Sequence, residues 1–188
     1  MNPNRSLRGR LRLGACAMLA SAVVASPALS DEPAERRGTA TFEIRFLEGM
    51  IDHHHMAVMM AELCEGRATH AELLNLCSQI RMTQMAEMHQ MSSWLEDWYG
   101  RTYHPEMKPG MMRKIERLGE LSGAEFEIEF MEMMIRHHEE AVREAGSCVE
   151  KAEHDELVAL CETMHGAQEH EITQMRQWLC DWYERCRH

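Results

Sequence analysis

The sequence predicts an all-α protein in which two copies of an antiparallel helical hairpin pack together as a four-helix bundle. Three observations lead to this fold class. The chain contains a long internal repeat, its apolar residues recur at the spacing of buried helix faces, and after residue 30 its prolines occur only outside the expected helices. Together they predict short loops inside each hairpin and one longer connection between the hairpins.

The first 30 residues have the composition of a secretory signal peptide. Four arginines precede an apolar run from Leu13 to about Ala25, and small residues lead up to Ser30. We therefore expect a signal peptide over 1–30, a periplasmic or secreted mature protein, and a flexible N-terminus over 31–40.

The charge of the mature chain argues against nucleic acid as a partner. Removing residues 1–30 removes four arginines and no acidic residue, so the formal net charge falls from −11 to −15. After the signal peptide, no apolar run approaches the roughly 18 residues that a membrane-spanning helix needs. We therefore expect one compact domain without a membrane span.

An internal repeat divides the rest of the chain into two hairpins. Residues 42–99 align without a gap onto residues 126–183, each position displaced by 84, and about half of the paired residues are identical. We place the first hairpin at 41–100 and the second at 124–188. Met50-Ile51-Asp52-His53-His54 recurs as Met134-Ile135-Arg136-His137-His138.

Each repeat shows two amphipathic helices. In the first helix, two adjacent lines of residues follow the helical spacing and form one wide buried face. These lines are Phe46, Met50, His53, Ala57, Met60 and Cys64, and Leu47, Ile51, His54, Val58 and Ala61. The second helix buries Leu73, Leu76, Ile80, Gln84, Glu87, Met91, Trp94 and Trp98. Thr69 and Glu72 are spaced as a capping box at its start.

Residues 101–123 form the predicted linker between the hairpins. They contain Pro105 and Pro109, and a short helix is expected over 111–118. Ser122 and Glu125 are spaced to cap the next long helix. Four long helices with one longer connection give the bundle a ferritin-like outline.

The cysteines suggest how the helices of a hairpin are aligned. In an antiparallel hairpin, facing residues have a constant index sum, and Cys64 with Cys77 gives 141. The same sum pairs His54 with Glu87 and Met50 with Met91. In the second hairpin, pairs that sum to 309 are Cys148 with Cys161, His138 with Glu171 and Met134 with Met175.

Six cysteines follow the signal peptide, an even number that is typical of disulfides in an oxidising compartment. We hypothesise the bridges Cys64–Cys77 and Cys148–Cys161 near the hairpin turns. Buried free thiols and metal-bound thiolates are the alternatives. A bridge between Cys180 and Cys186 requires the last helix to end near Tyr183, because a helix holds residues six apart too far from each other.

Polar side chains on the buried faces need partners, because burying them unpaired costs several kcal/mol. Either they form a purely structural hydrogen-bond network or they bind a metal. Duplication favours a metal, since antiparallel packing of the hairpins brings both sets to one level of the bundle. The expected ligands are Met50, His53, His54, Glu87, Met91, Met134, His137, His138, Glu171 and Met175, supported by Gln84 and Gln168.

The ligand types favour copper, with silver, zinc or iron as alternatives. Imidazole suits copper, zinc and iron, whereas thioether sulfur selects soft ions such as Cu(I). Methionine is also an ordinary core residue. Methionines on outer helix faces are harder to explain by packing, so we hypothesise an auxiliary soft-metal patch. It consists of His55, Met59, Met82, Met85 and His89.

Two motifs resemble a secreted bacterial family called "domain of unknown function 305". They are Met-Ile-x-His-His in the first helix and Gln-x-x-Glu-x-x-x-Met-x-x-Trp-Leu in the second, and both repeats carry them. The resemblance implies a ferritin-like bundle and a metal-binding role, with some relatives linked to copper handling. It points to the imidazoles, Gln84, Glu87, Met91 and their counterparts. His55-Met56 becomes Glu139-Glu140 in the second repeat, so the two repeats need not bind metal equally.

These observations favour a periplasmic metal-binding protein that sequesters or transfers copper or silver. The first alternative is a ferritin-like oxidase, whose Glu-x-x-His pattern is met by Glu162 and His165 but has no counterpart in the first repeat. The second is a structural or partner-binding bundle without metal. The sequence shows no nucleophilic triad and no phosphate-binding loop, and we make no claim of catalysis. The expected partners are metal ions, with a metal-delivery protein and a homodimer left open.

Overall fold

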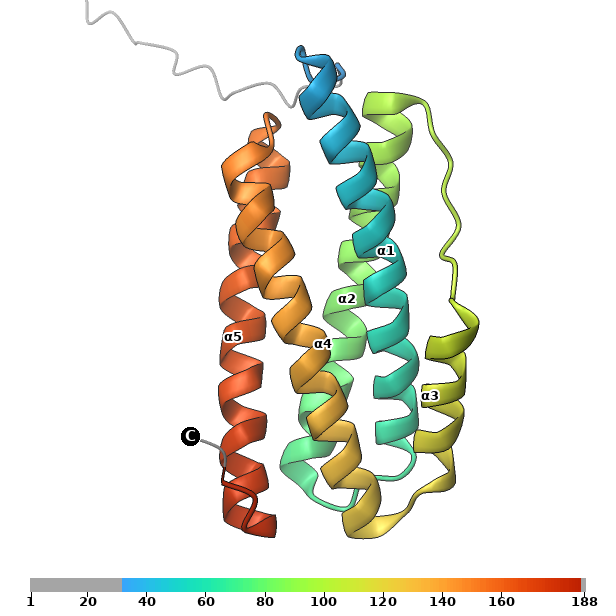
Figure 1. The fold of residues 1–188 in the computed structure, drawn as a ribbon, viewed down its shortest axis with the longest axis vertical. Coiled ribbons are helices and arrows are strands. Elements are labelled where there is room, and N and C mark those ends of the chain that lie inside the picture. The colour runs from blue at the N-terminus through green and yellow to red at the C-terminus, as the bar shows by residue number, and fades with distance from the viewer. Residues whose placement is uncertain (1–31, 187–188) are drawn as a thin grey trace, which may run out of the picture.

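The computed structural model describes residues 32–186 and confirms the all-α prediction (Figure 1). The predicted signal peptide lies outside the described residues. These residues form five helices, in the order α1 (Arg37–Glu65), α2 (Ala71–Tyr99), α3 (Pro109–Glu120), α4 (Gly123–Lys151) and α5 (Asp155–Tyr183). The short helix expected in the linker is α3, and the four long helices each contain 29 residues.

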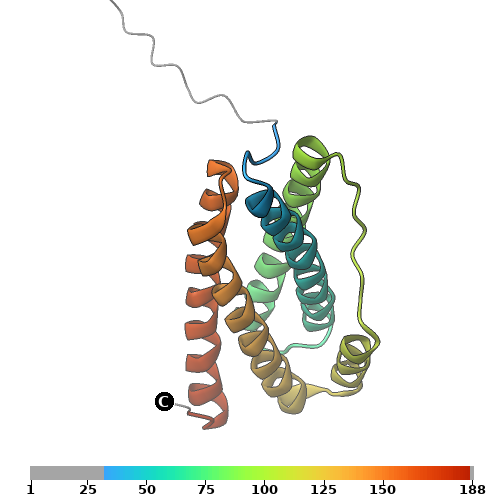
Figure 2. The same cartoon turned by 45° about the horizontal axis from the view of Figure 1, so that its top comes forward.

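The long helices form two antiparallel hairpins, α1–α2 and α4–α5, that meet mainly through α1 and α4 (Figures 1 and 2). α1 and α4 run in opposite directions, so the two hairpins are related by an approximate twofold rotation. The linker returns along the outside of the first hairpin and places α3 against α1 and α4. None of the described helices is long and apolar enough to cross a membrane.

Helix starts differ from the sequence prediction in three places. α1 begins at Arg37, so the last residues of the expected flexible segment are helical. The capping box at Thr69 is not formed, because α2 is preceded by His70 as its N-cap and no side chain caps it from within the hairpin. Ser122 does precede α4 as predicted, but its side chain makes no capping hydrogen bond. At the start of α2, a group from elsewhere in the molecule therefore satisfies the backbone amides.

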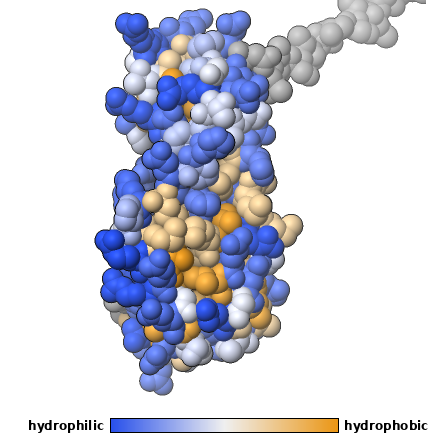
Figure 3. Space-filling model, turned by 90° about the vertical axis from the view of Figure 1, so that its right-hand side faces the viewer, coloured by the Kyte–Doolittle hydropathy of each residue, from blue (hydrophilic) through white to orange (hydrophobic). Residues whose placement is uncertain are grey.

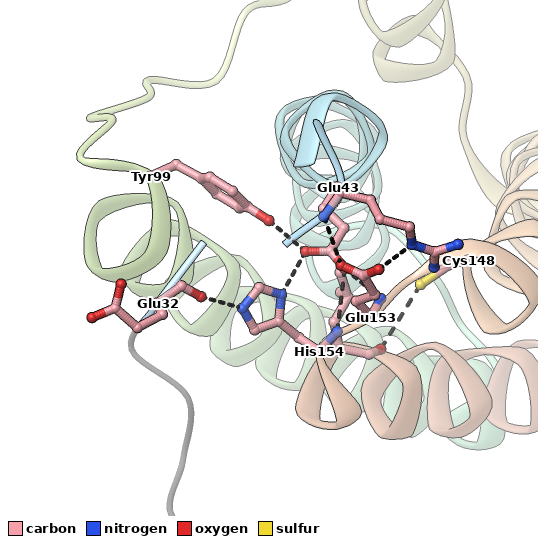
Figure 4. A network of polar contacts seen from close by, with 8 residues as sticks. Glu32, Glu43, Tyr99, Cys148, Glu153 and His154 are labelled. Atoms are coloured by element: carbon pink, nitrogen blue, oxygen red, sulfur yellow. Dashed lines mark hydrogen bonds and ion pairs between the residues drawn. The ribbon is translucent and has the colours of Figure 1, made fainter. Parts of the chain in front are cut away.

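Two fully buried glutamates cap the starts of α2 and α5, each from the opposite hairpin. Glu43 of α1 accepts hydrogen bonds from the backbone amides of Glu153 (2.7 Å) and His154 (3.2 Å) at the start of α5. It also accepts from His154 Nδ1 (2.6 Å) and from the Tyr99 hydroxyl (2.5 Å). Figure 4 shows the side chains of Tyr99 and His154 converging on this carboxylate.

Glu127 of α4 repeats the arrangement at the start of α2, 84 positions along the chain. It accepts from the backbone amides of Thr69 and His70, from the Thr69 hydroxyl (2.9 Å), from His70 Nδ1 (2.6 Å) and from Tyr183. His70 stacks on Trp182 at 3.9 Å between ring centroids. We call these two sets the Glu43 and Glu127 clamps. They hold the hairpins in their antiparallel alignment.

The structure contains the two predicted disulfides and the third that was left open. Cys64 is bonded to Cys77 and Cys148 to Cys161, with Cα–Cα distances of 6.1 and 6.2 Å. Cys180 is bonded to Cys186, and α5 ends at Tyr183 as this bond requires. Each bond joins two residues of the same hairpin.

The apolar core consists of two clusters, and each contains side chains from both hairpins. One cluster includes Leu47, Met50, Met91 and Trp98 with Leu157 of α5. The other contains Phe126, Phe130, Met134 and Met175 with residues of α1, α2 and α3. Figure 3 shows apolar side chains on the surface at the height of α3.

Candidate metal centre

Four histidines from α1 and α4 meet where the two hairpins face each other. His53 and His137 stack with 3.5 Å between their ring centroids. His54 and His138, the next residue on each helix, are fully buried. We call these four residues the imidazole layer. Antiparallel packing of α1 on α4 places equivalent residues of the two repeats side by side, as the duplication predicted.

The predicted alignment within each hairpin is confirmed at this layer. His54 Nε2 lies 2.7 Å from Glu87 Oε2, and His138 Nε2 lies 2.6 Å from Glu171 Oε2. Both carboxylates are partly accessible, whereas both imidazoles are not. Two histidine–carboxylate pairs therefore flank the stacked pair of His53 and His137.

Most of the ring nitrogens in the layer have no hydrogen-bond partner. Both nitrogens of His53 and His137 are buried and unpaired, as are Nδ1 of His54 and Nδ1 of His138. Oε1 of Gln84 and Oε1 of Gln168 are also unpaired, and both glutamines are buried. Unpaired polar atoms at this density are unusual in a protein interior and need an explanation.

The stacked histidines are neutral at physiological pH. Burial lowers the pKa of His53 to about 3, with a further contribution from the neighbouring His54. Burial also holds the pKa of His137 well below its usual value, and the adjacent His53 adds to the effect. A neutral imidazole keeps one nitrogen lone pair free, which is the form that binds metal ions.

The predicted methionine ligands are fully buried but are divided between the two core clusters. Met50 and Met91 belong to one cluster, and Met134 and Met175 to the other. The structure thus brings the four imidazoles together, and it places each methionine pair in a different part of the core. Each pair combines one residue from each helix of a hairpin, as the index sums predicted.

The donor set suits a soft ion better than a hard one. Among the described residues, no three His, Cys, Asp or Glu side chains lie close enough to hold a metal. Glu87 and Glu171 are each engaged by a histidine. The donors that remain in the layer are therefore neutral imidazole nitrogens, which copper accepts.

The auxiliary patch is exposed mainly on α2. Met82 and Met85 are 64% and 38% exposed, the most exposed methionines of the described chain, and His89 is also exposed. His55 and Met59 on α1 are half-buried, and Met59 packs partly against the core. The outward position of the α2 methionines agrees with the sequence prediction.

Residues 32–186 do not assemble the di-iron pattern that the oxidase alternative requires. Glu162 lies on the exposed surface of α5, and the half-buried His165 is 3.5 Å from Glu169 on the same helix. Neither belongs to the imidazole layer. The carboxylates that contact the layer are Glu87 of α2 and Glu171 of α5. Two helices therefore contribute one carboxylate each, whereas the di-iron pattern draws on all four.

Sequence reasoning missed the two clamps. Glu43, His70 and Tyr99 are identical to Glu127, His154 and Tyr183, and this identity was the available signal. These residues lie near helix ends, where polar residues are common. Their recurrence therefore did not indicate a specific interaction. Their positions show that they stabilise the hairpin turns and lie apart from the imidazole layer.

Solved structures that resemble this chain include metal complexes of one protein, CopM. Its Cu(I)-bound form is 31% identical, with 75% of this chain and 97% of CopM covered and a TM-score of 0.68. Its Ag-bound form, obtained by co-crystallisation, is 32% identical with the same coverage and a TM-score of 0.67. No curated protein matches the chain.

A DUF305 protein from Streptomyces coelicolor, described as secreted, is 25% identical over 74% of this chain and 91% of its own, with a TM-score of 0.66. The sequence profile of "Domain of unknown function (DUF305)" matches residues 43–179, which include both hairpins and the imidazole layer. The chain therefore belongs to the DUF305 family.

Proposed function

We propose that this protein binds copper, or silver, at the imidazole layer and sequesters or transfers the ion. The observation that carries the proposal is the set of buried ring nitrogens without partners in His53, His54, His137 and His138. A structural network would pair these atoms with one another, whereas only the two histidine–carboxylate contacts are made. Metal coordination would compensate the cost of burying the remaining nitrogens.

The pairing of His54 with Glu87 supports the same role. A ligating histidine commonly hydrogen-bonds through its second nitrogen to a carboxylate, which fixes the ring and makes the other nitrogen a better donor. Nε2 of His54 faces Glu87 and leaves Nδ1 unpaired, and His138 with Glu171 repeats this arrangement. Each pair thus presents one oriented nitrogen donor.

The choice of copper or silver rests on the donor chemistry and on the relatives. The candidate donors are neutral imidazoles and two pairs of buried methionines, and thioether sulfur favours soft ions. CopM, which shares the fold, has been crystallised with Cu(I) and with Ag. Zinc and iron are the alternatives, since imidazole suits both.

The proposal is tested by anaerobic titration with Cu(I), Ag(I), Zn(II) and Fe(II), followed by measurement of oxygen consumption. The double variant His53→Phe/His137→Phe keeps two stacked rings and removes four nitrogens. We expect its Cu(I) affinity to fall by about a hundredfold. His104→Phe is the control, because His104 is exposed in the linker.

Unchanged Cu(I) affinity in the folded double variant would show that the layer is not the binding centre. Oxygen consumption with Fe(II) at catalytic rates would favour the oxidase alternative. Circular dichroism of each variant establishes that the fold is retained.

We also infer that the auxiliary patch binds a further soft ion. The exposure of Met82 and Met85 supports this, because exposed methionines gain little from packing. Changing His55, Met59, Met82, Met85 and His89 to Ser should lower the Cu(I) stoichiometry. An unchanged stoichiometry would contradict the inference.

We propose that the protein acts in the periplasm or outside the cell. The three disulfides support an oxidising compartment, and a DUF305 relative is described as secreted. A metal-delivery protein and a second copy of the chain are its proposed protein partners. Protease protection of the protein in intact cells, compared with cells whose outer membrane is permeabilised, tests the location.

A further inference from the structure

A groove of about 570 Å³ opens between α3 and α4 and reaches down to α1. Three methionines line it, one from each helix: Met56 of α1, Met111 of α3 and Met133 of α4. Met56 and Met133 are buried, and Met111 is half-buried. The groove lies beside α3, on the side of the molecule whose surface is partly apolar in Figure 3.

His137 connects this groove with the imidazole layer. It is among the groove-lining residues, it is only 4% exposed, and both of its ring nitrogens lack a hydrogen-bond partner. Its ring also stacks on His53. An ion in the groove would therefore lie against the residue that carries unpaired nitrogens of the layer.

The internal repeat does not account for the groove methionines. The positions equivalent to Met56 and Met133 in the other repeat are Glu140 and Gly49, and α3 has no equivalent at all. Three thioethers thus come to one groove from unrelated positions. A leucine would fill the same space, so packing alone does not explain the choice of sulfur.

The charges around the groove are balanced. Three basic and three acidic side chains line it, namely Lys114, Arg117, Arg136, Glu120, Glu129 and Glu140. Arg136 lies 3.7 Å from Glu129, which partly neutralises that carboxylate. A hard divalent cation would require an excess of free carboxylates, whereas a soft monovalent ion can be held by sulfur.

We propose that the groove is an entry site for a soft monovalent cation, held by the thioethers of Met56, Met111 and Met133 and passed to His137. This inference rests on the proposed function, because it assumes that the imidazole layer is the destination. It adds a binding site formed by the linker helix and a direction of entry. The ion keeps its oxidation state, and only its ligands change.

The test compares two triple variants of the full chain. In the groove variant, Met56, Met111 and Met133 are replaced by Leu, which keeps apolar volume and removes sulfur. In the control, Met88, Met107 and Met112 are replaced by Leu, since they are half-buried but do not line the groove. Ag(I) stoichiometry is measured by calorimetry, and Cu(I) uptake from a chromophoric chelator by stopped flow.

We expect the groove variant to bind one Ag(I) fewer than the wild type and to take up Cu(I) about tenfold more slowly. The control should match the wild type in both measurements. Unchanged stoichiometry and rate in the groove variant would overturn the entry site, as would an equal loss in the control. If His53→Phe/His137→Phe still lowered the Cu(I) affinity about a hundredfold, the proposed function would stand without the groove. If the wild type bound neither ion, both proposals would fall.

Discussion

The carboxylate of Glu127 is fully buried and accepts hydrogen bonds from Thr69, His70 and Tyr183. Replacing it by Gln keeps the volume but removes the charge and turns one acceptor into a donor. We expect Glu127→Gln to lower the free energy of unfolding by about 3 kcal/mol. Urea unfolding followed by circular dichroism measures this. Glu132→Gln is a control on the same helix, and an equal effect of both changes would contradict the clamp.

The Glu127 clamp also predicts part of the acid sensitivity. Burial alone would raise the pKa of Glu127, but the hydrogen bonds from Tyr183, Thr69 and His70 outweigh it and lower the pKa to about 2. The stabilising contribution of the ionised form is therefore complete above the ordinary pKa of 4.5 and is lost as pH falls toward 2. We expect the stability difference between wild type and Glu127→Gln to shrink over this range. A pH-independent difference would contradict it.

At the level of single residues, the sequence predicted the buried polar positions but not all their partners. The spacing on each helix and the index sums identified His54 with Glu87 and His138 with Glu171. The stacking of His53 on His137 depends on how the hairpins pack, which periodicity within one helix does not encode. The clamps were missed for the same reason, because each joins residues more than 50 positions apart.

The C-terminal ends of α2 and α5 adopt the same backbone turn with different residues. Gly100 and Glu184 both have positive φ, 61° and 56°, and each donates its backbone N–H to the preceding helical turn. The left-handed conformation is easy for glycine and strained for other residues. We expect Glu184→Gly to stabilise the protein by about 1 kcal/mol.

The matched substitution at the end of α2 should change the stability in the opposite direction. Gly100→Ala should destabilise by about 1 kcal/mol, and a Cβ there meets no other atom, so the effect is one of backbone strain. Thermal unfolding of both variants provides the measurement. Two shifts of the same sign would contradict this interpretation.

Helix extents were predictable because each long helix buries a continuous apolar face, whose period the sequence displays directly. The positions and caps of helix starts were less predictable from the sequence. The capping box at Thr69 follows a local rule, yet its hydroxyl donates to Glu127, a residue of the other hairpin. Local capping rules assume that a helix start is satisfied by its own segment, and here a long-range carboxylate replaces that interaction.

The whole fold followed from the duplication, and the duplication also predicts how half of the molecule would behave. Residues 32–108 contain both a clamp carboxylate, Glu43, and a turn of the kind it caps, at His70. We expect this fragment to form a homodimer in which each copy caps the turn of the other. Analytical ultracentrifugation measures the mass. A folded, stable monomer would show that the clamps are dispensable.

The disulfides lie within the hairpins, and none of those in residues 32–186 crosses between them. Disulfide formation therefore cross-links each hairpin within itself. The interface between the two hairpins is held by the clamps and by apolar contacts. Transient parting of the two hairpins would break no disulfide, and it would separate the stacked rings of His53 and His137, one from each hairpin. The redox state of the surroundings therefore affects the stability of each hairpin. It does not link the two hairpins covalently, so their separation depends on thermal motion alone.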